Sequence, residues 1–218
     1  KLPVVFAVDR AGLVGSDGET HQGIFDLSYL SMMPNMTVLA PKNDRELEEM
    51  LAFAVSFDGP IAIRYPRGSA HQGLREYQAP VEYGRSEIIR KGKKIAVLGV
   101  GSMIPSCMEI CKGLKDDGYD PTFVNARFVK PLDVDLLDEL AKDHSLFVTV
   151  EENVKSGGYG EHVSAYMEAC HPEIRVLSAA VWDRFVPQGN VESLRSRIGL
   201  GVEDIRQAIE DSEELREQ

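Results

Sequence analysis

The chain carries the sequence DRAGLVGSDGETHQG at residues 9–23, between a predicted strand at Pro3–Val8 and a predicted helix at Phe25–Met32. Four residues of this segment are glycines, which adopt backbone conformations that other residues avoid and let a ligand approach the main chain closely. In open α/β sheets, ligands bind in the loops that follow the carboxyl ends of the strands. The segment therefore predicts an α/β fold with a ligand-binding loop after its first strand.

This loop contains three side chains suited to chemistry on a small polar ligand. Arg10 offers a planar guanidinium that matches a phosphate group, and His21 can move a proton near neutral pH. Asp17 can orient the imidazole or accept a hydrogen bond from a hydroxyl group. From spacing alone, a simple turn at Asp17 and a helix-capping role for His21 are equally good interpretations.

A fourth candidate, Arg67, follows the predicted strand Ile61–Tyr65. The carboxyl ends of parallel strands meet at one edge of a sheet, so Arg67 is expected on the same edge as Arg10. A surface arginine without a binding role, or an ion pair to the linker, is the alternative interpretation of Arg67.

The rest of the chain alternates short apolar runs with segments of helical period, which is typical of α/β folds with mainly parallel sheets. Two three-layer α/β units in series are predicted: residues 1–70 with a parallel sheet, a linker at 71–82, and residues 83–218 with a mixed, mostly parallel sheet. The remaining predicted strands are Thr37–Ala40, Ile95–Gly99, Pro121–Asn125, Leu146–Glu151 and Glu173–Leu177. The remaining predicted helices are Asp44–Phe57, Ile104–Asp117, Asp133–Lys142, Tyr159–Cys170 and Val202–Glu210. A turn at Lys91–Lys94 is predicted to pair Glu87–Arg90 with Ile95–Gly99 as an antiparallel hairpin, which would place one antiparallel edge strand on the second sheet.

The composition narrows the class of protein. The formal net charge of −11 argues against a nucleic-acid or anionic-membrane partner, which would need clustered Lys and Arg. No apolar run approaches the roughly 20 residues that span a bilayer. Three cysteines do not make a disulfide framework, so a reducing compartment is expected, most simply the cytoplasm.

The residue 9–23 segment resembles the loop of thiamine diphosphate enzymes of the transketolase superfamily, whose pyrimidine-binding domain carries a G-x-D-G-x-T-H-Q pattern. With the following Phe25–Leu30, the whole string is similar to that of the 1-deoxy-D-xylulose-5-phosphate synthases. The resemblance covers nearly the whole chain and suggests a C-terminal portion of such an enzyme. Its further matches are Pro34–Met36, Ala40–Pro41, Arg64–Gly68, Val129–Asp133, Glu151–Asn153 and Asp183–Gly189.

The resemblance implies an activity and roles for residues. Such an enzyme condenses pyruvate with D-glyceraldehyde 3-phosphate, releases carbon dioxide and forms 1-deoxy-D-xylulose 5-phosphate, a precursor of isoprenoids, thiamine and pyridoxol. Arg10 and Arg67 would hold the phosphate of the aldehyde acceptor. Asp17 and His21 would contact the substrate hydroxyl and carbonyl groups, with His21 as the candidate proton relay. The intact enzyme is expected to be a homodimer.

The resemblance also implies that part of the active site lies elsewhere. The glutamate that contacts the aminopyrimidine of thiamine diphosphate is expected upstream of this chain, as is the G-D-G…N motif that holds the diphosphate and Mg²⁺. No Gly-Asp-Gly occurs in the sequence. The chain alone is therefore expected to bind neither cofactor nor metal, to be inactive, and to need the N-terminal half of the same enzyme. Alternatives are another thiamine diphosphate enzyme, namely a transketolase or a 2-oxoacid dehydrogenase β subunit, and a non-catalytic assembly module with the same fold.

Overall fold

The computed structural model describes residues 1–212. Its first unit contains a four-stranded sheet in the order β1-β3-β2-β7, and the first three strands are parallel. Two helices cover opposite faces of this sheet. Apolar side chains of α1 pack against Val38 and Ala62 on one face, and those of α2 pack against Leu39 and Ile63 on the other. The elements are β1 (Val5–Val8), α1 (Asp26–Ser31), β2 (Thr37–Leu39), α2 (Asp44–Val55), β3 (Ile61–Arg64) and β7 (Phe128–Lys130).

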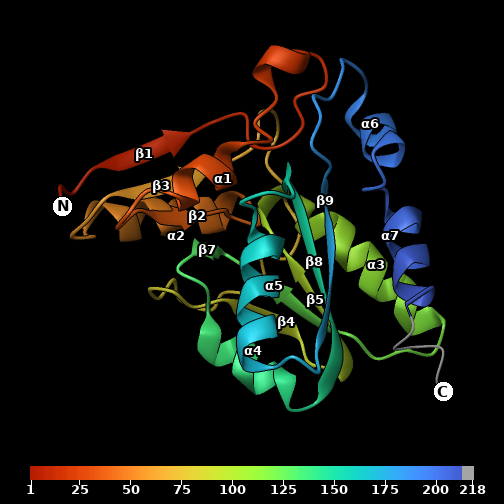
Figure 1. Ribbon diagram of the computed structural model, residues 1–218. Coiled ribbons are helices and arrows are strands. Elements are labelled where there is room, and N and C mark those ends of the chain that lie inside the picture. Colours follow the sequence, from red (N-terminus) through yellow and green to blue (C-terminus); the bar gives the residue numbers. More distant parts are fainter. Residues whose placement is uncertain (213–218) are drawn as a thin grey trace.

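The second unit contains a five-stranded sheet in the order β4-β6-β5-β8-β9, with only β4 antiparallel. Figure 1 shows this sheet with α3 and α7 to one side and α4 and α5 to the other. Side chains of β5 alternate between two cores: Ile95 and Val97 face α3 and α7, whereas Ala96 and Leu98 face α4 and α5. The strands are β4 (Glu87–Arg90), β5 (Lys94–Gly99), β6 (Thr122–Asn125), β8 (His144–Val154) and β9 (Arg175–Val181). The helices are α3 (Ile104–Asp116), α4 (Val134–Ala141), α5 (Tyr159–Cys170), α6 (Val191–Arg197) and α7 (Val202–Glu210).

The prediction of two three-layer α/β units is confirmed, and every predicted strand and helix overlaps an observed one. Two helix starts follow from local chemistry. The Asn43 side chain accepts a hydrogen bond from Glu46 N at 2.9 Å, and the Asp133 side chain accepts one from Leu136 N at 3.2 Å. Each satisfies a backbone donor that has no partner within its helix. Within residues 1–212, no helix is long and apolar enough to cross a membrane.

Three details differ from the sequence-based expectation. The first sheet is not wholly parallel, because β7 pairs antiparallel with β2. The predicted hairpin at Lys91–Lys94 is wrong, because β4 pairs with β6 and not with β5, but β4 is the antiparallel edge strand that was expected on this sheet. The helix α6 was not predicted, although Asn190 caps it through hydrogen bonds from Glu192 N and Ser193 N.

The two units share a core. Leu27 of α1 belongs to the same apolar cluster as Leu98 of β5 and Phe147 of β8. The strand β7 connects them further, because it follows β6 of the second sheet yet pairs with β2 of the first. Its Lys130 ammonium donates to Ser31 O and Met33 O near the end of α1, both at 2.7 Å. These contacts fix the relative position of the units and of the loops between them.

Candidate functional site

The residue 9–23 loop is closed at its base by its own backbone. Gly12 and Gly23 exchange hydrogen bonds of 3.0 and 2.8 Å between their amides and carbonyls. A Cβ on Gly23 would lie 2.0 Å from Arg10 O, so only glycine fits at this position. Arg10 itself has a φ of 59°, in a region that residues with a side chain rarely adopt. Such backbone conformations cluster at binding sites, where the surroundings hold them in place.

The second unit braces the outer part of this loop. Gly189 N donates to Gly15 O at 3.0 Å, and the Gln188 side chain donates to Ser16 O at 3.1 Å. A Cβ on Gly15 would lie 1.9 Å from Gly189 O, which explains the second glycine of the loop. The buried side chain of Gln22 also joins the loop to the second unit: it accepts a hydrogen bond from Val14 N and donates one to Val186 O at 3.4 Å. The segment 186–189 is therefore part of the framework of the site.

Three of the four predicted site residues come together. Arg10 Nε lies 3.4 Å from Asp17 Oδ2, and Arg67 Nη1 pairs with Asp17 Oδ1. Arg67 is thus on the same sheet edge as Arg10, as predicted. Partial desolvation raises the pKa of the Asp17 carboxyl, but the hydrogen bonds and charges of Arg67 and Arg10 outweigh it and hold this pKa below its usual value. Asp17 is therefore ionised at neutral pH between two exposed guanidinium groups.

The fourth predicted residue, His21, lies apart from this cluster. It ends a short 3₁₀ helix, η1 (Glu19–His21), where its exposed ring lies 2.9 Å from the Thr20 hydroxyl. Among the contacts of residues 1–212, none joins His21 to Arg10, Asp17 or Arg67. Its role as a proton relay stays a prediction.

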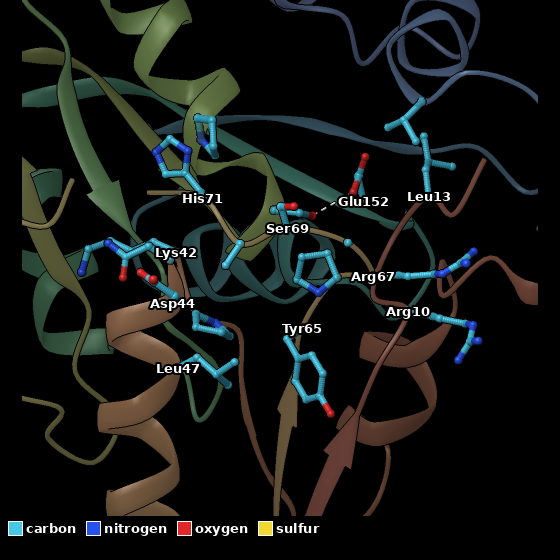
Figure 2. A pocket seen from close by; sticks show the side chains of 18 of the residues that line it. Arg10, Leu13, Lys42, Asp44, Leu47, Tyr65, Arg67, Ser69, His71 and Glu152 are labelled. Carbon is cyan, nitrogen blue, oxygen red and sulfur yellow. Dashed lines mark hydrogen bonds between the residues drawn. The ribbon is translucent and has the colours of Figure 1, made fainter. Parts of the chain in front are cut away.

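A cavity of about 700 Å³ opens beside the cluster, between the two units. Figure 2 shows Arg10 and Arg67 at one end of it and Lys42 and Asp44 at the other. The first unit contributes the ends of β1 and β3 with the loops that follow. The second unit contributes three polar residues, which are Ser102, Glu152 and Arg195. The cavity therefore lies where the carboxyl ends of strands from both sheets meet, which is the usual place for a ligand in α/β proteins.

The three residues Glu151-Glu152-Asn153, near the end of β8, form hydrogen bonds to three different helices: α5, α6 and α1. Glu151 accepts hydrogen bonds from Tyr159 N and Gly160 N, at 2.9 and 2.8 Å, and so satisfies the first turn of α5. Glu152 accepts from Arg195 Nε at 2.7 Å, and Asn153 accepts from Leu27 N of α1 at 3.0 Å. Sequence reasoning used these residues only as a family motif. Three consecutive polar residues after an apolar strand were the available signal of a structural role.

Arg64, the last residue of β3, links this segment to the loop. The residue is 2% exposed. Its Nη2 donates to Gly23 O at 2.6 Å and to Glu152 O at 2.8 Å, and its Nε donates to Asp26 Oδ2 at 3.2 Å. Arg64 therefore ties the end of the residue 9–23 loop to the second unit.

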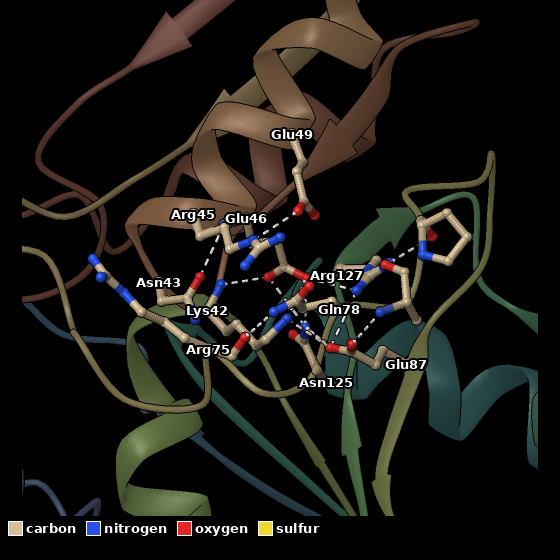
Figure 3. A network of polar contacts seen from close by, with 12 residues as sticks. Lys42, Asn43, Arg45, Glu46, Glu49, Arg75, Gln78, Glu87, Asn125 and Arg127 are labelled. Carbon is tan, nitrogen blue, oxygen red and sulfur yellow. Dashed lines mark hydrogen bonds and ion pairs between the residues drawn. The ribbon is translucent and has the colours of Figure 1, made fainter.

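A second group of charges lies buried between the units (Figure 3). Lys42 Nζ lies 3.1 Å from Glu46 and 2.7 Å from Glu87, while Arg127 Nη2 lies 2.8 and 3.1 Å from the same two carboxylates. Asn125 Nδ2 donates to both carboxylates. We call these five residues the buried network. Because all five side chains are buried, and ion pairs or hydrogen bonds join them to one another, the arrangement is structural.

The sequence matches two family models: the pyrimidine binding domain of transketolase over residues 1–72 and the C-terminal domain of transketolase over residues 84–205. The chain therefore belongs to the transketolase family. The pyrimidine-binding match implies that the intact enzyme uses thiamine diphosphate.

Within this family, the sequence is similar to 1-deoxy-D-xylulose-5-phosphate synthases. It is 50% identical to that of Lachnoclostridium phytofermentans over 206 residues, which are 94% of this chain and 33% of the relative. It is 45% identical to that of Dictyoglomus thermophilum over 210 residues, which are 96% of this chain and 34% of the relative. The chain thus spans about a third of the length of the curated relatives it matches.

Solved structures show the same fold. A split-gene transketolase described as an inactive β4 tetramer superposes with a TM-score of 0.85 at 29% identity, over 98% of this chain and 66% of the other. A transketolase from Campylobacter jejuni gives a TM-score of 0.71 at 19% identity, over 95% of this chain and 31% of the other. The predicted relationship to transketolase-type enzymes is confirmed.

The described residues do not fit the metal-bound part of thiamine diphosphate. Within residues 1–212, no three His, Cys, Asp or Glu side chains gather as a metal site would require. The carboxylates that line the cavity are already paired: Asp9 with Arg10, Asp44 with Arg75 and Glu152 with Arg195.

Proposed function

We propose that this chain is part of a 1-deoxy-D-xylulose-5-phosphate synthase and supplies the acceptor-binding side of its active site. The reaction joins pyruvate to D-glyceraldehyde 3-phosphate with loss of carbon dioxide. The proposal is supported by the 42–50% identity to synthases of that name over about 95% of the chain. The observation that carries it is the meeting of Arg10 and Arg67 at Asp17, beside the cavity between the units.

Two guanidinium groups suit the phosphate of the acceptor for electrostatic and geometric reasons. Arg10 and Arg67 come from loops after different strands, and their side chains are 41% and 51% exposed, so a ligand can reach them. A phosphate dianion offers each guanidinium a charge-assisted, bidentate partner. Without ligand, Asp17 occupies the same donors, so an arriving phosphate competes with a carboxylate that is already paired.

Asp17 and His21 are assigned to the reacting end of the acceptor within this proposal. Once phosphate takes the guanidinium groups, Asp17 is free to accept a hydrogen bond from a substrate hydroxyl. An aldehyde that becomes an alkoxide needs a proton or a strong hydrogen bond, and an exposed imidazole such as that of His21 can supply one.

The remaining parts of the enzyme are assigned outside this chain. Thiamine diphosphate supplies the carbanion chemistry when it is bound. We place its metal and diphosphate, with the glutamate for its aminopyrimidine, in the N-terminal half of the same enzyme. Val5 and Phe6 of the edge strand β1 are partly exposed, which supports packing of further protein there. The homodimer and the cytoplasmic location belong to the same proposal.

The test compares two acceptors in the complete enzyme. Arg10→Ala removes charge-assisted hydrogen bonds to phosphate, each worth about 1.5–3 kcal/mol, so kcat/KM for D-glyceraldehyde 3-phosphate should fall about 10- to 100-fold. With unphosphorylated D-glyceraldehyde as acceptor, and for the KM of pyruvate, the variant should match the parent enzyme. Arg45→Ala, on the exposed face of α2, is the control and should change neither acceptor. Equal losses with both acceptors would remove the phosphate assignment.

A further inference from the structure

One residue of the second unit touches both arginine-bearing segments of the first. Glu152 lies at the end of β8 and is 2% exposed, yet it forms part of the cavity wall (Figure 2). Its two carboxylate oxygens are both engaged: Oε1 accepts from Arg195 Nε at 2.7 Å and Oε2 accepts from Ser102 Oγ at 2.8 Å. The carboxylate is therefore fixed in place.

The carboxylate packs directly against the loop that carries Arg10. Gly12, two residues after Arg10, has a φ of 72°, and a Cβ at this position would lie 2.2 Å from Glu152 Oε2 and 2.8 Å from Glu152 Cβ. The Glu152 side chain thus occupies the space that a side chain on Gly12 would need. It sets how far the base of the loop can move toward the second unit.

The backbone of the same residue holds the segment that carries Arg67. Glu152 O accepts from Arg64 Nη2 at 2.8 Å, and Arg64 precedes Arg67 by three residues. The same Nη2 donates to Gly23 O at 2.6 Å, and Gly23 closes the loop against Gly12. The segment that carries Arg10 and the segment that carries Arg67 therefore both contact Glu152.

We propose that Glu152 is a positioning residue that sets the spacing of Arg10 and Arg67, and that this is a function of the C-terminal unit in the enzyme. This inference rests on the phosphate site proposed above. Glu152 acts through the shape of its side chain against Gly12 and through its acceptor for Arg195. Displacing a binding group by about 1 Å can cost a factor of about 100 in rate, so small changes at Glu152 should reach the acceptor.

The main test compares Glu152→Ala with Glu152→Gln in the complete enzyme. The alanine variant leaves Gly12 without support, and the KM for D-glyceraldehyde 3-phosphate should rise about tenfold or more. The glutamine variant keeps the volume against Gly12 and an oxygen for Arg195, so this KM should stay within about twofold of the parent value. With unphosphorylated D-glyceraldehyde, both variants should match the parent. Equal losses with the two acceptors would overturn the proposal.

Two kinds of experiment guard against a variant that simply fails to fold. Thermal unfolding and calorimetric binding of thiamine diphosphate show whether each variant keeps the native fold. If Glu152→Ala does not fold, Glu152→Asp draws the carboxylate away from Gly12 by one methylene, and the KM for the phosphorylated acceptor should rise about three- to tenfold. An unchanged KM in Glu152→Asp would overturn the proposal. Glu168→Gln, an exposed carboxylate of α5, is the matched control and should leave both acceptors unchanged.

A double-variant cycle separates this inference from the proposed function. If Glu152 acts through Arg10, adding Glu152→Ala to Arg10→Ala should cost less than about twofold more, because interacting residues are not additive. Independent, multiplying losses would overturn the positioning role. If Arg10→Ala itself shows no phosphate-specific loss, the proposed function fails first. If Arg10→Ala shows that loss and Glu152→Ala does not, only the inference on Glu152 fails.

Discussion

Two clusters with the same number of cations and carboxylates lie at opposite ends of the cavity. The exposed cluster has two cations, Arg10 and Arg67, with Asp9 and Asp17 as partners. The buried network also has two cations and two carboxylates, but each of these four side chains is 1–3% exposed. The first cluster is open to a ligand, whereas the side chains of the second are closed to solvent.

The difference shows that solvent exposure decides what a charge cluster can do. Exposed ion pairs contribute about 0–1 kcal/mol, so a phosphate can displace Asp17 from its arginines at little cost. Buried charges lose their hydration, and each then depends on its partners. Burial raises the pKa of Glu87, but the hydrogen bond from Lys42 and the charge of Arg127 outweigh it and lower this pKa overall. The buried network therefore holds the units together and is unsuited to exchanging partners.

The largest expected effect comes from breaking the buried network. Arg127→Met leaves Glu46 and Glu87 with Lys42 as their one ion-pair partner among residues 1–212, and the free energy of unfolding should fall by about 3–5 kcal/mol. Urea denaturation of the chain measures this loss. Arg45→Met removes an exposed pair with Glu49 on α2 and should cost less than about 0.5 kcal/mol. Similar losses in the two variants would contradict the division between structural and exchangeable charges.

The buried carboxylate of Glu151, whose hydrogen bonds come from backbone N–H groups, sharpens the comparison. Burial raises the pKa of Glu151 to about 7, although Gly160 N and Tyr159 N donate to it. The folded chain then binds a proton that the unfolded chain releases near pH 4.5, so Glu151 should reduce stability progressively as pH rises from about 4.5 to 7. The loss should reach about 3 kcal/mol and stay constant above that range.

Glu151→Gln tests this effect because the amide cannot ionise. The difference in urea midpoint between parent and variant should change across pH 4.5–7 in favour of the variant. Parallel pH profiles for the two proteins would show that the backbone donors and the charge of Arg64 keep this buried carboxylate ionised.

The smallest expected effect concerns the exposed cluster. Asp17→Asn removes the carboxylate that competes for Arg10 and Arg67, so inorganic phosphate should bind up to about fivefold more tightly. Calorimetric titration of the chain with phosphate measures this change, and Asp58→Asn, outside the cluster, is the matched control. Weaker binding in Asp17→Asn would mean that Asp17 holds the two arginines in place for phosphate instead of competing with it.

The sequence predicted most of the fold because its elements have strong local signals. The cap residues Asn43 and Asp133 and the alternating apolar runs lie within the elements they specify. The errors concern pairing between distant segments. The turn at Lys91–Lys94 looks like a hairpin, but β6 inserts between β4 and β5. The strand β7 has only three residues, and its partner β2 lies in the other unit, so no local sequence pattern predicts it.

The site shows the same difference between what local sequence predicts and what depends on contacts between distant segments. Arg10, Asp17 and Arg67 follow strands, so sheet geometry alone placed them at one edge. Glu152 was not predicted as part of the site, because its partners Ser102 and Arg195 approach it only after the second unit folds. The buried network was also missed, although single charges such as Arg127 within an apolar run were a signal.

The strand β7 has a consequence for dividing this protein. A cut between β3 and β4 follows the division suggested by the sequence, but it would strip the first sheet of the strand beside β2. The exposed edge of β2 would then be a template for pairing with other chains. The piece ending near residue 70 should therefore aggregate when it is expressed by itself, and adding the remaining piece during folding should rescue it.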